Sequence, residues 1–167
     1  RGEFCTSLDA VIYALDENDE RWIFPIEWKY TESYPRKDLS MGAKGKVRLS
    51  RYCNIQEDNL IGNSCQLKPL ADYKGSIYFQ EPFYQLMRQT LLAERICCNK
   101  DDSYTPAKHF VHIHVCPSAN KELLYGEYND VTDKESMETA WRSMLKDQSL
   151  YHLVDPKEFM QPIAETY

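Results

Sequence analysis

The chain has 167 residues, 43% of them hydrophobic and 28% charged, and a net charge of −6. This length fits one domain with a substantial core, and no apolar run approaches the length of a membrane span. We see no signal-peptide pattern. The six cysteines form no Cys-x-x-Cys pair and read as reduced thiols, although an even count is also compatible with disulfides. We therefore expect a cytoplasmic globular protein that does not bind nucleic acid indiscriminately.

Two segments near the N-terminus are expected to form a β-hairpin. Residues 7–15 and 21–30 are rich in β-branched and aromatic residues, as strands are. The polar segment 16–20 between them is typical of a turn. A loop centred on this segment pairs residues whose numbers add up to 36, which sets Asp9 opposite Glu27.

Three charged side chains are predicted to meet on one face of this hairpin. Glu27 and Lys29 point to the same side of their strand, about 7 Å apart. Asp9 lies across from Glu27, and the Cβ atoms of opposed residues are about 5 Å apart. Two neighbouring carboxylates repel each other unless a cation lies between them, and Mg²⁺ is held by one or two carboxylates and several waters. The alternative is a Glu/Lys pair on the solvent face of an exposed strand.

The pattern of Asp followed by Glu-x-Lys on a hairpin resembles the PD-(D/E)xK nuclease superfamily. The string IEWKYTESY at 26–34 is similar to uncharacterised bacterial proteins described as restriction-endonuclease-like. The resemblance weakens through a helix at 81–97 to a strand at 109–116. It implies an α/β (α+β) restriction-endonuclease-like core, a mixed central sheet flanked by helices. Leu8 stands where the motif's name has proline, and Pro25 interrupts the motif strand, so we expect an edge or a bulge there.

The resemblance also implies an activity, namely metal-dependent hydrolysis of a phosphodiester bond by a DNA endonuclease of the restriction or repair type. Asp9 and Glu27 would hold one or two Mg²⁺ or Mn²⁺ ions, and the backbone carbonyl of Trp28 would add a ligand. Lys29 would position the attacking water or contact the phosphate oxygens.

Residues 81–97 are predicted to form a helix because Pro82 suits a first turn and strong helix formers follow. Gln85, Arg88 and Gln89 fall on one side of it, at spacings of three and four. In the nucleases that this chain resembles, the corresponding helix often brings a glutamine towards the active site. Gln85 is the first choice, ahead of the other two, and the alternative is a polar stripe that faces solvent.

A basic segment follows the motif strand. Between positions 36 and 51 there are six basic residues and one acid, Asp38. The basic residues are Arg36, Lys37, Lys44, Lys46, Arg48 and Arg51. Gly42 and Gly45 indicate a flexible loop, whose cations would contact the phosphate backbone of DNA. The alternative is an ordinary solvated loop.

Later in the chain, residues 109–116 alternate in polarity and predict a strand. His112, His114 and Cys116 share one face, so they are candidates for a zinc site, or they line a half-buried sheet face. We expect a further helix at 134–146, and residues 52–80 remain unassigned.

Two broader alternatives stay open. The chain is either an active nuclease or an inactive nuclease-fold module that only binds nucleic acid or protein, and either form would be compatible with a homodimer. We expect residues 1–167 to be a single nuclease-like domain. The resemblance implies a helix and a strand before the one that holds Asp9, so we expect those elements in a longer parent chain. The sequence does not separate DNA from RNA, or endonuclease from exonuclease cleavage.

Overall fold

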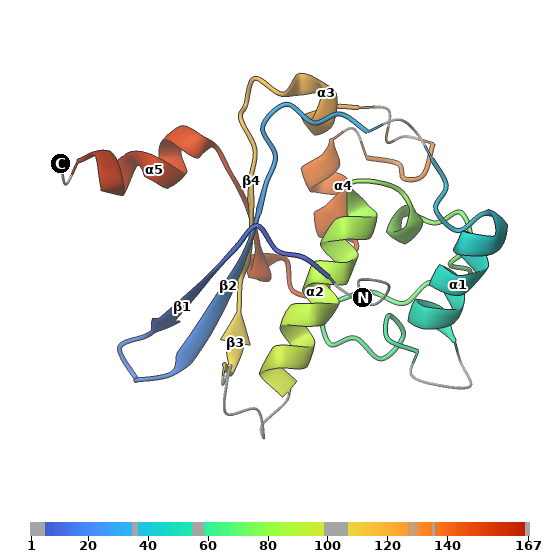
Figure 1. Cartoon of the computed structure of the whole chain (residues 1–167), viewed down its shortest axis with the longest axis horizontal. Coiled ribbons are helices and arrows are strands. Elements are labelled where there is room, and N and C mark those ends of the chain that lie inside the picture. Colours follow the sequence, from blue (N-terminus) through green and yellow to red (C-terminus); the bar gives the residue numbers. More distant parts are fainter. Residues whose placement is uncertain are drawn as a thin grey trace.

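The computed structural model describes residues 6–34, 37–54, 59–98, 107–126, 128, 130–134 and 136–165. A mixed β-sheet with helices beside it forms the centre of the molecule (Figure 1). The strands are β1 (Ala10–Leu15), β2 (Arg21–Trp28), β3 (His109–Phe110), β4 (His112–Val115) and β5 (Tyr151–Val154). The helices are α1 (Gly42–Cys53), α2 (Phe83–Cys98), α3 (Lys121–Leu124), α4 (Met137–Ser143) and α5 (Pro156–Ala164), with short 3-10 turns at Ile77–Phe79 and Gln148–Leu150. This architecture confirms the predicted fold class.

The predicted hairpin is present. β1 and β2 pair in antiparallel fashion from Ala10 opposite Ile26 to Leu15 opposite Arg21, so the numbers of paired residues add up to 36 as expected. The turn is stabilised by Asp16, whose carboxylate accepts hydrogen bonds from the backbone N–H groups of the second and fourth residues after it, at 2.8 and 2.9 Å. Such local bonds from aspartate are characteristic of turns.

β2 is an internal strand, with β1 on one side and the parallel strands β3 and β4 on the other. β2 as a whole is therefore not an edge strand, but at Pro25 it is locally an edge, as expected. The parallel ladder is interrupted there: β3 pairs as far as Ile23, and β4 pairs from Ile26 onward. Because proline has no N–H to donate, the ladder loses little at this gap. The same gap explains why the predicted strand 109–116 is split into β3 and β4.

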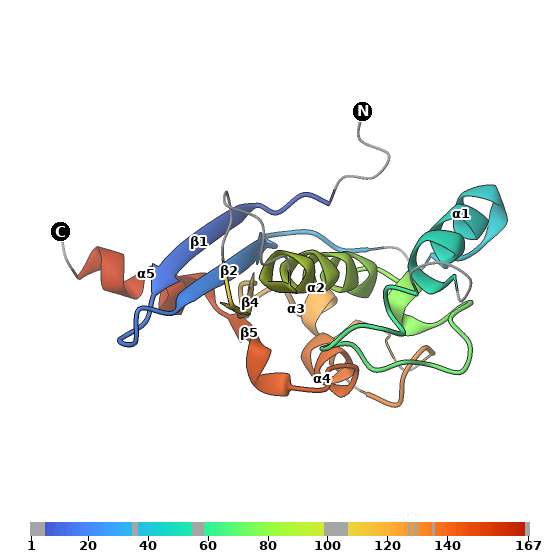
Figure 2. The same ribbon diagram turned by 90° about the horizontal axis from the view of Figure 1, so that it is seen from below.

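Helices α2 and α4 cover one face of the sheet, and their apolar side chains form the main core. Phe83 of α2 and Trp141 of α4 are fully buried and stack with ring centroids 6.4 Å apart. Tyr151 of β5 meets Trp141 edge to face at 6.5 Å. α5 contacts the other face, through Phe159 against Trp28. Figure 2 shows α5 extending away from the rest of the molecule.

Two predicted segments differ from the observed ones. The basic segment is not a flexible loop, since most of it forms α1. Gly45 is buried in this helix, where an added Cβ would lie 2.1 Å from backbone atoms of Ser40. The glycine thus permits close packing of α1 on the chain that precedes it. The helix expected at 134–146 is shorter, because a capping box between Ser136 and Thr139 starts α4 at Met137. In the described part of the chain, no helix is long and apolar enough to cross a membrane.

Candidate active site

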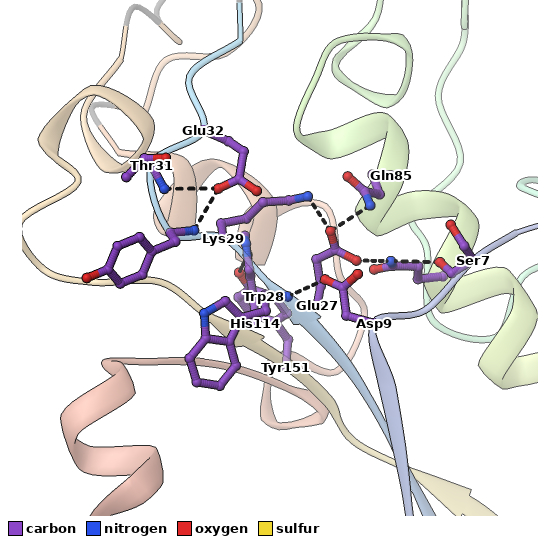
Figure 3. A network of polar contacts seen from close by, with 12 residues as sticks. Ser7, Asp9, Glu27, Trp28, Lys29, Thr31, Glu32, Gln85, His114 and Tyr151 are labelled. Carbon is purple, nitrogen blue, oxygen red and sulfur yellow. Dashed lines mark hydrogen bonds and ion pairs between the residues drawn. The ribbon is translucent and has the colours of Figure 1, made fainter.

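Glu27 lies at the centre of a polar cluster between β2 and α2 (Figure 3). Its side chain is almost fully buried, with 1% of the residue exposed. Oε1 accepts a hydrogen bond from Nε2 of Gln85 at 2.6 Å and forms an ion pair with Nζ of Lys29. Oε2 accepts a hydrogen bond from Nε2 of Gln89. Three donors therefore fix the position of one buried carboxylate, as such a group requires.

Asp9 approaches this cluster from the end of β1. The ladder stops at Ala10, and the chain bends at Asp9, whose N–H donates to the carbonyl of Ile26 at 3.2 Å. Its Oδ2 accepts from the N–H of Trp28 at 2.8 Å, which brings the carboxylate beside the peptide group that follows Glu27 (Figure 3). Asp9 is exposed and Glu27 is buried. Asp9 is thus held beside the strand segment that carries Glu27, with the Asp9 carboxylate facing solvent and the Glu27 carboxylate enclosed (Figure 3).

Lys29 is 7% exposed and lies on the same side of β2 as Glu27. Burial works against its charge, but the hydrogen bond and the charge of Glu27, together with Tyr34, raise its pKa above the usual value. The ammonium lies 5.7 Å from the centre of the Tyr34 ring. Its raised pKa keeps Lys29 protonated at neutral pH, so the side chain can donate hydrogen bonds and is not available as a base.

Both glutamines of α2 contact Glu27, which extends the sequence prediction. Gln85 was the first choice, and the structure places it on Glu27. Gln89, one turn later, is fully buried and also donates to the carbonyl of Ser7 at 3.2 Å. It does not face solvent. The spacing of four residues already put the two amides on one side of the helix.

The side chains of His112 and His114 in β4 are buried, and both pack against the ring of Tyr151 in the neighbouring strand β5. Nδ1 of His114 lies 2.9 Å from the Tyr151 hydroxyl. Burial lowers the pKa of His112 to about 4 and that of His114 to about 3, so both are neutral at pH 7. Within the described ranges, no group of three or more His, Cys, Asp or Glu side chains is arranged to hold a metal ion. The contacts therefore favour two histidines in the core of a sheet face over a zinc site.

Glu81 was not singled out from the sequence. It precedes α2 and lines a cavity of about 240 Å³ together with Tyr34 and Tyr128. Burial raises the pKa of its carboxyl group, and its Oε2 is buried without a hydrogen-bond partner among the described residues. The charge of Lys29 acts in the opposite direction on that pKa, which places the acid near the cluster. The signal available in the sequence was a carboxylate directly before the predicted helix.

The cluster contains donor types that a hard divalent cation uses, and both oxygens of Glu27 are engaged by Gln85, Gln89 and Lys29. Mg²⁺ takes one or two protein carboxylates and completes its shell with water. Asp9 uses Oδ2 for the Trp28 N–H, and its other oxygen has no hydrogen bond to any residue that the structure describes. Since the N–H and C=O of one strand residue point to the same edge, the Trp28 carbonyl faces the side on which Asp9 lies. Asp9, Glu27 and that carbonyl are the groups that would hold the ion.

The predicted phosphate-contacting residues are spread along and before α1. Lys37, Lys44 and Lys46 are exposed. Arg48 is half-buried, donates to the carbonyl of Leu39 at 2.9 Å and lies over the ring of Tyr84. Arg51 near the end of α1 lines a separate cavity. Arg36 lies outside the described residues.

Taken together, a mixed sheet flanked by helices, with acidic and basic side chains gathered at the motif hairpin, defines a protein of restriction-endonuclease-like architecture. The family model described as "Restriction Endonuclease associating with ARP" (REase-ARP) matches residues 1–167, and the chain belongs to this family. Its function is therefore nuclease-related. No curated protein and no solved structure matches the chain significantly.

Proposed function

We propose that this protein is a Mg²⁺- or Mn²⁺-dependent nuclease of the PD-(D/E)xK type, which hydrolyses phosphodiester bonds of nucleic acid, with DNA as the expected substrate. The observation that carries the proposal is the meeting of Asp9, Glu27 and Lys29 at the end of the hairpin. A bound divalent ion would lower the pKa of a water and stabilise the charge that develops on the phosphate.

The residues of this chain have separate roles in the proposal. Asp9 and Glu27 supply the hard oxygen ligands, and Gln85 and Gln89 keep the Glu27 carboxylate in one orientation through their amide N–H groups. Lys29, held as an ammonium by its raised pKa, donates hydrogen bonds to phosphate oxygens. A positively charged donor placed in advance at developing negative charge is a major source of catalysis.

The second candidate is a module with a nuclease fold that binds nucleic acid without cutting it. The burial of Glu27 under three donors favours it, because a carboxylate so well paired within the protein is also a stable structural element. The two candidates differ in whether a divalent ion is needed for any activity.

A cleavage assay separates these candidates. Purified protein is incubated with supercoiled plasmid, linear duplex and single-stranded DNA, each with Mg²⁺, with Mn²⁺ or with EDTA. We expect cleavage of at least one substrate with a metal and none with EDTA. Asp9→Asn should abolish it, because the amide keeps the shape of the side chain and removes the anionic ligand.

The matched control is Asp19→Asn. Asp19 lies in the hairpin turn with a φ of 59°, a conformation that asparagine adopts readily, so this variant should cleave like the wild type. Equal cleavage by Asp9→Asn and the wild type, or cleavage that persists in EDTA, would overturn the proposed role of the carboxylates. Binding of DNA with no cleavage of any substrate would support the binding-only module.

A further inference from the structure

A second cavity is lined by residues of α1 and α2. Figure 1 shows α1 on the side of α2 that faces away from the sheet. Its volume is about 500 Å³, which is within the range of small-molecule pockets. Residues of the end of α1, of the loop 60–65 and of α2 line it, together with Thr6 of the N-terminal segment.

The walls carry a concentration of positive charge. Arg51 comes from α1, and Arg88 and Arg95 come from α2. The two arginines of α2 are seven residues apart, so they lie on one face of the helix about 10.5 Å apart along its axis. A carboxylate also lines the cavity, that of Glu94, and its Oε1 is engaged by the hydroxyl of Ser64 and the N–H of Gln66, at 2.7 and 2.5 Å. Three guanidinium groups around one cavity stand out in a chain with a net charge of −6.

The remaining wall is apolar. Tyr52 is buried at the base of the cavity, where its ring meets that of Tyr84 edge to face. Leu60, Leu91 and Leu92 are half-buried and complete this surface. A ligand complementary to this cavity has an anionic group that binds the arginines and a small apolar part that packs on the leucine and tyrosine side chains. A nucleotide has this composition, because its phosphate binds guanidinium groups and its base packs on apolar and aromatic side chains.

The cavity is connected to the carboxylate cluster. Arg88 donates from Nη2 to the Thr6 hydroxyl at 3.4 Å. The next residue, Gln89, donates to the carbonyl of Ser7 and to Glu27. The cavity and the cluster thus share α2 and the short segment that leads to Asp9.

We propose that this cavity binds one unstacked nucleotide of the nucleic acid strand, with its phosphate on Arg51, Arg88 and Arg95 and its base on the leucine and tyrosine wall. The inference rests on the proposed nuclease function and adds a substrate class to it, namely nucleic acid with unpaired nucleotides. A nucleotide in an intact duplex has its base stacked and paired, so it presents only its phosphate to such a cavity.

Binding without cleavage tests this proposal. Fluorescence anisotropy in EDTA compares a labelled 12-nucleotide single strand with the same sequence as a duplex, for the wild type and for Arg95→Ala. Arg95 is exposed on α2, and alanine favours the helix, so the variant should fold. We expect the wild type to prefer the single strand and Arg95→Ala to lose about tenfold in affinity for it, the effect of one charge-assisted hydrogen bond.

Controls separate this pocket from a general effect of charge. Arg21→Ala removes an exposed arginine at the start of β2 and should bind the single strand like the wild type. Adenosine monophosphate should compete with the labelled strand, and inorganic phosphate at equal ionic strength should not. Equal competition by adenosine monophosphate and inorganic phosphate would show that the cavity binds phosphate without recognising the base. Binding of the free nucleotide without binding of the strand would identify a separate nucleotide site. Either result would overturn the proposal.

The failure of this inference is distinguishable from the failure of the proposed function. If the single strand binds as described but is never cleaved with Mg²⁺ or Mn²⁺, nucleotide binding in the cavity is supported and the proposed nuclease activity is wrong. If duplex and single strand are cleaved and bound equally well by the wild type and by Arg95→Ala, the nuclease function stands and the pocket is wrong.

Discussion

The ion pair between Glu27 and Lys29 gives a sharp prediction about stability. Both residues are buried, at 1% and 7% exposure, so neutralising one of them leaves the other charge without a partner in a medium of low dielectric constant. Removing one partner of a buried pair costs about 3–5 kcal/mol. For a protein of this size each kcal/mol corresponds to about 2–4 °C in the melting temperature. Glu27→Gln should therefore unfold roughly 6–20 °C below the wild type at pH 7.

The assay is thermal and urea unfolding followed by circular dichroism. Replacing both charged residues, in Glu27→Gln/Lys29→Met, should recover part of the loss, because no charge then remains unpaired. Glu20→Gln is the matched control: Glu20 contacts Lys108 at 3.0 Å and His109 at 2.8 Å near the surface, and exposed ion pairs contribute about 0–1 kcal/mol each. If Glu27→Gln lies within about 1 kcal/mol of the wild type, or if the double variant is no more stable than the single one, the argument from burial is refuted.

The sign of the pH dependence follows from the raised pKa of Lys29. The folded state holds the lysine proton more tightly than the unfolded chain, whose lysines titrate near pH 10.4. The stabilising contribution is thus fully present below about pH 10.4 and is lost as the pH rises through the higher folded pKa. In Glu27→Gln this alkaline loss should be smaller, which unfolding measured between pH 9 and 12 would check.

Three further predictions concern other parts of the chain. His112, with its pKa lowered to about 4, takes up a proton more readily when unfolded, so stability should fall below about pH 6.5, by about 2 kcal/mol at pH 5; urea unfolding of His112→Leu should lack this part of the loss. Lys44→Ala/Lys46→Ala removes two exposed cations of α1 and should weaken DNA binding and its dependence on salt concentration. An unchanged salt dependence would show that these two lysines do not contact the phosphate backbone. Gly45→Ala should destabilise the fold by about 1–3 kcal/mol, because the added Cβ would lie 2.1 Å from the backbone of Ser40. Unfolding at the same denaturant concentration as the wild type would show that α1 can move away from Ser40 without loss of stability.

Much of the candidate site followed from the sequence because its geometry is local. A short polar turn between two strand-forming segments fixes the register of a hairpin, and the register fixes which residues face each other. The observed pairing of Ala10 with Ile26 agrees with that reasoning. The helix α2 was also predictable, since strong helix formers follow Pro82. The hairpin and this helix together were enough to predict that the side chains of one site are Asp9, Glu27, Lys29 and Gln85.

The features that were missed depend on contacts between distant segments. α1 contains two glycines, which lower its intrinsic helix propensity. Its helical form depends on packing that the sequence does not display, including the approach of Gly45 to Ser40. The burial of Gln89 was equally hidden, because helical spacing shows which residues share a face and not which face meets the sheet. The division of β3 from β4 became clear only beside Pro25 in the neighbouring strand.

Binding of a divalent metal ion by Asp9 and Glu27 is measured by titrating the protein with Mn²⁺ and following the free ion by electron paramagnetic resonance. The wild type should bind Mn²⁺, and Mg²⁺ should displace it. Asp9→Asn should lose most of this binding while its circular dichroism spectrum stays that of the wild type. Equal Mn²⁺ binding by Asp9→Asn and the wild type, or no binding by the wild type, would show that these carboxylates do not hold a metal ion.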